Sequence, residues 1–100
     1  MEAIDAALVC KALSDSNRIQ IVQLLTGGEM CACKLLEHFH ITQPTLSYHM
    51  QILSGCDLVN RRREGVKTFY SLNCETLTSF RNFIGTLKCS SSSKTPHGYP

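Results

Sequence analysis

The stretch TQPTLSYHMQILSG, residues 42–55, predicts a helix with well-marked ends and two different faces. Thr42 is a good N-cap, and a proline in the first turn is tolerated because its missing N–H would have no partner there. Leu46, Met50 and Leu53 recur at helical spacing, so they are expected to face a core. The other face is polar and rich in hydrogen-bonding groups, namely Gln43, Thr45, Ser47, Tyr48 and Gln51. One side of this helix is therefore expected to pack and the other to meet a partner.

A hairpin signal follows this helix. Residues 59–63 and 66–72 flank Glu64-Gly65, and glycine supplies the positive φ that a tight hairpin turn needs. Counting outward from that turn puts Val59 opposite Tyr70 and Arg61 opposite Thr68. Apolar periodicity and capping residues predict further helices at 2–13, 17–25, 31–38 and 75–88.

Length and composition bound the class of protein. The chain has 100 residues, and with 43% hydrophobic and 18% charged residues it is too apolar for a disordered chain. We expect one domain over 1–88 and a disordered Ser/Pro-rich tail over 89–100. No apolar run is long enough to cross a membrane, and the acidic, interrupted N-terminus is unlike a signal peptide, so a cytoplasmic location is expected. Net charge is −3 over residues 1–60 and +5 over 61–100.

The order of elements predicts a winged helix-turn-helix, a mainly α fold with a β-hairpin wing (α+β). The helix over 43–55 would enter the major groove of double-stranded DNA, where its Gln, Ser and Thr side chains suit base edges. The basic hairpin would lie against the DNA backbone or in a minor groove, where its contacts would set affinity and salt dependence rather than sequence preference. His49 lies between the two helix faces, so a base contact and a half-buried, hydrogen-bonded histidine both remain open. The expected DNA-binding residues are Gln43, Thr45, Ser47, Tyr48, His49, Arg61, Arg62, Arg63 and Lys67.

The first and last helices carry more apolar surface than so small a core needs. Exposed apolar stripes of this kind mark interfaces. We therefore expect a twofold homodimer through these two helices, which would read an inverted-repeat operator with half-sites about 10 bp apart. The residues expected at the interface are Ile4, Leu8, Leu77, Phe80, Ile84 and Leu87.

Six cysteines in a chain without an export signal indicate metal binding or redox sensing rather than a disulfide framework. Cys31 and Cys33 form a Cys-x-Cys pair at the predicted start of a helix. A disulfide-exchange enzyme is not expected, because neither a Cys-x-x-Cys motif nor a βαβ pattern accompanies the pair.

Four segments carry a resemblance to a known family: ALSDSNR (12–18), GEMCAC (28–33), TQPTLSYHM (42–50) and REGVKTFY (63–70). Over about residues 4–88 the chain resembles the ArsR/SmtB family of metalloregulatory repressors, and most closely its arsenic-responsive members. The resemblance implies a dimer that represses a metalloid-resistance operon and leaves its operator when ligand binds, with no prosthetic group and no enzymatic activity. Some arsenic-responsive members carry a third cysteine where this chain has Leu36.

Trivalent arsenic and antimony prefer three thiolates, and soft thiolate sites select soft ions. Cys31 and Cys33 would supply two, with both pKa values lowered by the helix N-terminus. Related cadmium and lead sensors recruit an N-terminal cysteine, which favours Cys10 as the tentative third ligand, with Cys56 as the second choice. The family's other site, on the last helix, is not expected because residues 74–88 contain no histidine or aspartate.

The spacing of the pair also suggests a switch. Positions i and i+2 of an α-helix point about 200° apart, so an ion shared by Cys31 and Cys33 is expected to distort the start of their helix. Cadmium or lead sensing and thiol-redox sensing remain as alternatives to arsenic.

Overall fold

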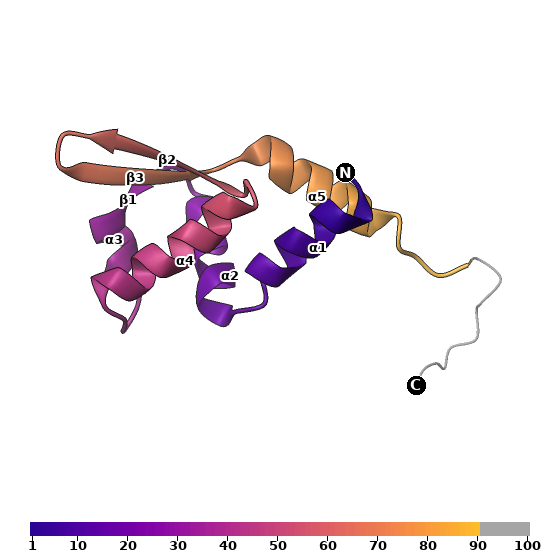
Figure 1. Cartoon of the computed structure of the whole chain (residues 1–100), viewed down its shortest axis with the longest axis horizontal. Coiled ribbons are helices and arrows are strands. Elements are labelled where there is room, and N and C mark those ends of the chain that lie inside the picture. The colour runs from indigo at the N-terminus through magenta and orange to yellow at the C-terminus, as the bar shows by residue number, and fades with distance from the viewer. Residues whose placement is uncertain (91–100) are drawn as a thin grey trace.

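The computed structural model describes residues 1–90, which form five helices and a small antiparallel sheet. The predicted tail at 89–100 lies almost entirely outside the described residues. Along the chain the elements are α1 (Ala3–Ala12), α2 (Ser16–Leu25), β1 (Met30–Cys31), α3 (Ala32–Leu36), α4 (Gln43–Gly55), β2 (Val59–Glu64), β3 (Lys67–Leu72) and α5 (Cys74–Gly85). Figure 1 shows α3, α4 and the hairpin toward one end of the molecule and α1 and α5 toward the other. None of the helices within residues 1–90 is long and apolar enough to span a bilayer.

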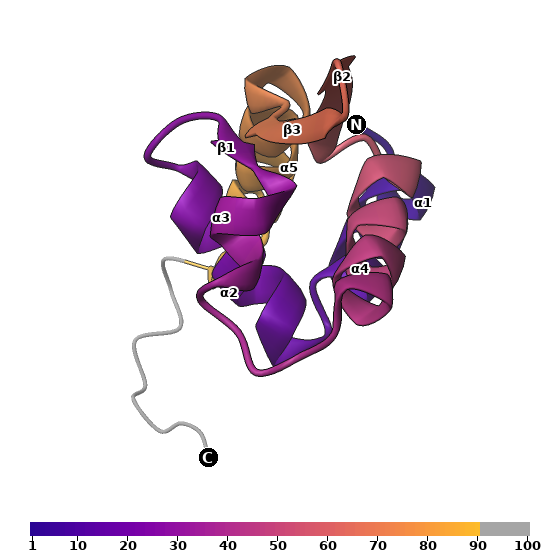
Figure 2. The ribbon, with the colours of Figure 1, turned by 90° about the vertical axis from the view of Figure 1, so that its left-hand side faces the viewer.

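The winged helix-turn-helix layout is confirmed. Helix α4 begins where the sequence predicts, with the Thr42 hydroxyl accepting a hydrogen bond from the Thr45 N–H at 3.3 Å. Asp15 caps α2 in the same way, accepting from Asn17 at 2.8 Å. Leu46, Met50 and Leu53 are buried, as expected, in one core with residues of α1, α2, α3 and the hairpin. Figure 2 looks onto α3, α4 and the three strands from the end that carries them.

The structure differs from the prediction in the bounds of α3 and α5 and in a third strand, β1, that joins the sheet. Helix α3 covers Ala32–Leu36 rather than 31–38, because Met30 and Cys31 form a short strand that pairs with Tyr70 and Phe69 of β3. The sheet order is therefore β1-β3-β2. Helix α5 ends at Gly85, so Leu87 lies beyond it.

The predicted hairpin register is also wrong, by two residues. Val59 pairs with Leu72 and Arg61 with Tyr70, because Glu64 still pairs with Lys67 and the turn is Gly65-Val66. Gly65 has φ of 63°, as the first turn residue of a type II′ hairpin requires. A shift of two leaves every side chain on its expected face of the sheet.

Candidate nucleic-acid interface and thiol site

The outer face of α4 is open to solvent. Gln43, Thr45, Ser47 and Gln51 are exposed, and Tyr48 is 59% exposed. A cavity of about 530 Å³ lies between this helix and the wing, and Ser47, Gln51 and Arg61 are among the residues that line it. The face that the sequence marks as polar is thus accessible along the helix and continuous with the wing.

His49 differs from its neighbours on α4. It is only 5% exposed, and its Nδ1 lies 2.9 Å from Nη1 of Arg18, which is itself 9% exposed. A guanidinium can only donate, so Nδ1 is the acceptor and the ring proton is on Nε2. Arg18 also donates through Nε to the Ala12 carbonyl at 2.6 Å. Of the two roles left open by the sequence, the structure gives His49 the buried, hydrogen-bonded one, which ties α4 to α1 and α2.

The three wing arginines do not have the same surroundings. Arg61 and Arg63 are exposed, and neither side chain makes a hydrogen bond or ion pair within residues 1–90. Arg62 instead donates to both carboxylate oxygens of Glu29, at 2.7 and 2.8 Å, and lies 3.5 Å from Glu64. This pairing lowers the pKa of Glu29 and raises the pKa of Arg62. Glu29 is 33 positions from Arg62, and no pattern in the sequence signals the contact.

Cys31 and Cys33 lie at a junction between strand and helix. Cys31 ends β1 and is the extended N-cap of α3, with φ of −78° and ψ of 155°, and Cys33 is in the first turn. The expectation that one helix runs through both residues is therefore wrong, and so is the inference that a shared ligand must distort that helix. The Cys33 thiol is placed to donate a hydrogen bond to a thiolate at Cys31.

This hydrogen bond separates the acidities of the two thiols. Donation from Cys33 lowers the pKa of Cys31, and the backbone N–H of Lys34 and the charge of Lys67 act in the same direction. The same hydrogen bond raises the pKa of Cys33. The expected lowering therefore holds for Cys31 and is wrong for Cys33. Cys31 is therefore the thiol that ionises first, and the Cys33 thiol stabilises the resulting thiolate.

Both cysteines line a cavity of about 150 Å³ that reaches the DNA-facing elements. Its other walls include Gln43, the first residue of α4, and Lys67 and Thr68 of the wing. The thiol pair therefore borders both the start of the exposed helix and the tip of the hairpin.

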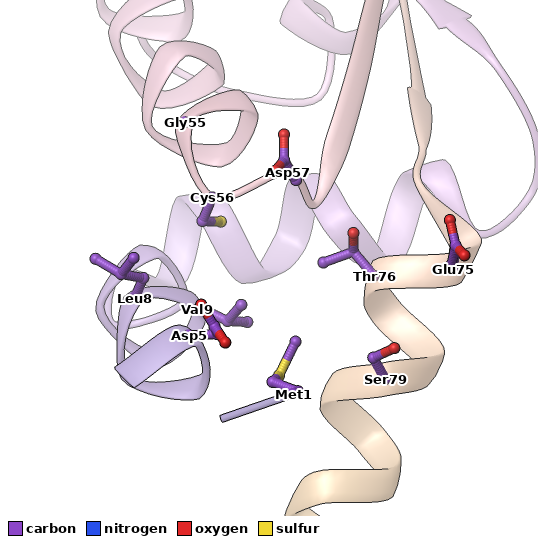
Figure 3. A pocket seen from close by; sticks show the side chains of 10 residues that line it. All are labelled: Met1, Asp5, Leu8, Val9, Gly55, Cys56, Asp57, Glu75, Thr76 and Ser79. Carbon is purple, nitrogen blue, oxygen red and sulfur yellow. The ribbon is translucent and has the colours of Figure 1, made fainter. Parts of the chain in front are cut away.

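The other cysteines lie elsewhere. Cys56 donates to the Leu53 carbonyl at 3.5 Å and lines a separate cavity of about 360 Å³ between α1 and α5, where burial raises its pKa. Figure 3 shows its sulfur among Leu8, Val9 and Asp57. Cys10 is exposed on α1, and Cys74 and Cys89 are exposed near α5. Within residues 1–90 no group of three or more Cys, His, Asp or Glu side chains is placed to hold a metal ion.

The residues expected at a dimer interface form two groups. Leu77 and Phe80 pack partly against the core from α5. Ile4 and Leu8 on α1 are 73% and 55% exposed, and Ile84 and Leu87 are exposed as well. The second group leaves an apolar surface uncovered at the end of the molecule away from α3.

A winged helix-turn-helix with an exposed polar helix beside a basic wing defines a DNA-binding transcriptional regulator rather than an enzyme. Residues 15–61 match the family model for bacterial regulatory proteins of the arsR family. The chain belongs to this family.

Its relatives and structural neighbours agree with this assignment. The chain is 51% identical over 69% of its length to the arsenical resistance operon repressor of Staphylococcus aureus, and 49% identical over 73% to that of Staphylococcus xylosus. The matched segments span 66% and 70% of those proteins, or about two thirds of each. The solution structure of a homodimeric winged helix-turn-helix DNA-binding domain from Mycobacterium bovis is similar over 82% of this chain and 77% of its own, with a TM-score of 0.69 and 29% identity.

Proposed function

We propose that this chain represses an arsenical-resistance operon and leaves its operator when trivalent arsenic or antimony binds Cys31 and Cys33. The observation that carries the proposal is that the two cysteines line one cavity together with Gln43 and residues of the wing. The names of the two staphylococcal relatives support the regulated process.

In the DNA-bound state two protomers would place their α4 helices in successive major grooves of an inverted repeat, about 10 bp apart. Gln43, Thr45, Ser47 and Tyr48 would meet the bases, while Arg61, Arg63 and Lys67 would bind phosphates and give the complex its salt dependence. The exposed face around Ile4, Leu8 and Ile84 would hold the two protomers together. The Mycobacterium bovis neighbour is itself a homodimer.

The ligand chemistry follows from the acidities of the two thiols. Cys31 is the more readily ionised and would attack arsenous acid first, its As–S bond replacing one As–OH bond. Cys33 would then displace a second hydroxyl, and each hydroxyl would leave as water with a proton from the thiols. Cys10 is our first choice for a third sulfur and Cys56 our second. Within residues 1–90 neither lies in a ligand cluster with the pair, so recruiting either sulfur would require a rearrangement when the ligand binds.

The test is release of the full-length dimer from a labelled operator duplex, selected by the protein from random-sequence DNA and followed by fluorescence anisotropy. Arsenite is expected to release the wild type and the Cys74→Ser control, and to leave the Cys31→Ser/Cys33→Ser double variant on the DNA. Release of the double variant by arsenite would overturn the proposal. Release of the wild type by cadmium, lead or a mild oxidant, with no response to arsenite, would assign a different effector to the same pair.

A further inference from the structure

A row of side chains crosses the sheet beside the thiol pair. Cys31 on β1 pairs with Phe69 on β3, and Phe69 pairs in turn with Arg62 on β2. Directly paired residues in antiparallel strands project from the same face. The Arg62 guanidinium accordingly lies over the Phe69 ring, with its central carbon 4.5 Å from the ring centroid.

Glu29 closes this row from the other side. It precedes Cys31 by two residues, yet its carboxylate reaches β2 and accepts two parallel hydrogen bonds from Arg62. Bidentate pairs of this kind fix geometry as well as adding energy. The loop that leads into Cys31 is thus joined to the wing both by the backbone pairing of β1 and by this side-chain pair.

The charges around Arg62 disfavour a phosphate contact. Two carboxylates, Glu29 and Glu64, lie within ion-pair distance of this single guanidinium, so the group as a whole is negative. Phosphate binding would have to displace both carboxylates and the stacking on Phe69. Arg63, the next residue along the strand, has no such partners among the described residues and faces the opposite side of the sheet.

We propose that the ion pair of Glu29 and Arg62, here called the clasp, transmits the ligand-binding state of the thiol pair to the wing. In this proposal Arg62 positions the wing and does not bind phosphate. A ligand on Cys31 changes the path of the chain just after Glu29. Because the clasp is rigid, the change moves β2 and with it Arg61 and Arg63, which point to the other face. This inference rests on the proposed function, since it concerns how the same site acts on DNA.

The experiment compares wild type with Glu29→Gln, Arg62→Gln and the charge-swapped double variant Glu29→Arg/Arg62→Glu. Arsenite is the probe. Arg63→Gln, on the same strand, is the matched control. Two quantities are measured on the selected operator duplex. One is the slope of log Kd against log salt concentration, and the other is the ratio of Kd values with and without arsenite.

The salt slope is expected to stay at the wild-type value in Arg62→Gln and to become shallower by about 1.8 in Arg63→Gln, since a dimer loses two phosphate contacts at about 0.9 each. The arsenite ratio is expected to fall about fivefold or more in both Glu29→Gln and Arg62→Gln, with unchanged arsenite stoichiometry, and to recover in the charge swap. If the pair only stabilised the fold, its loss would leave the ratio of Kd values with and without arsenite unchanged.

A slope in Arg62→Gln that falls as it does in Arg63→Gln, or a wild-type arsenite ratio in both single variants, would overturn the clasp while leaving the proposed function standing. If arsenite fails to release the wild type, the proposed function fails, and the transmission role of the clasp fails with it.

Discussion

Arg18 is a buried charged residue, and its loss is expected to destabilise the fold strongly. It joins three helices, because it donates to the Ala12 carbonyl at the end of α1 and to His49 of α4 from its own place on α2. Ala12 is one of the last residues of α1, so its carbonyl has no helical donor. In Arg18→Met both acceptors stay buried without a donor, at about 1–3 kcal/mol each. The substitution also removes the buried positive charge of Arg18, and losing the desolvation penalty of that charge offsets part of this cost.

We therefore expect Arg18→Met to lower the free energy of unfolding by about 3 kcal/mol, a large part of the roughly 5–15 kcal/mol typical of a domain. With a urea m-value of about 1.5 kcal/mol/M the midpoint falls by about 2 M. The assay is urea unfolding followed by circular dichroism at one protomer concentration, because a dimer's midpoint depends on it.

The free energy of unfolding of Arg18→Lys is expected to lie between those of wild type and Arg18→Met, because one ammonium group cannot make both hydrogen bonds of the guanidinium. Arg81→Gln, on the exposed side of α5, should stay within about 0.5 kcal/mol of wild type. A loss below about 1 kcal/mol in Arg18→Met would refute the reasoning, as it would mean that the two acceptors find other donors.

Three further predictions concern the thiol pair and the dimer. Cys33→Ala should raise the pKa of Cys31, because it removes the hydrogen-bond donor that is the main cause of the lowering. Cys31→Ala should lower the pKa of Cys33. The pH profile of the alkylation rate, which follows the thiolate, reports both shifts. Cadmium binding should release protons, because the cation displaces them from thiols, whereas arsenous acid loses its hydroxyls as water and should release almost none; calorimetry in buffers of different ionisation enthalpy separates the two ligands. Leu8→Glu should shift the chain toward monomers in sedimentation, and Val66→Glu, at the wing tip and 94% exposed, should not.

Helix α4 could be predicted well because its signals are local and agree with one another. A capping threonine, a proline in the first turn and an apolar repeat all depend on neighbours within a few positions, so the roles of Thr42 and Leu46 follow from the amino-acid sequence alone. The hairpin shows the limit of such signals. The turn consists of Gly65 and Val66. Because valine favours strands, the prediction placed Val66 in the second strand, and the predicted register was therefore off by two residues.

The contacts that join the site to the wing could not be predicted. Strand β1 has two residues, too few for any periodic pattern. The Glu29–Arg62 pair spans 33 positions and forms only because β1 docks on β3, and the Arg18–His49 pair spans 31. Such pairs depend on tertiary placement, which no local spacing encodes.

The position of Cys-x-Cys at a strand-to-helix junction also bears on whether both sulfurs could bind one ion. In a helix two such side chains point about 200° apart, and in a strand they share a face at about 6.6 Å, too far to share one small ion easily. The structure combines the two conformations, with an extended Cys31 followed by the first turn of α3. Under the proposed function, a ligand bridging the two sulfurs would leave the helix intact. The response would then pass through the contacts of this junction, which are the pairing of Cys31 with Phe69 and the hydrogen bonds between Glu29 and Arg62.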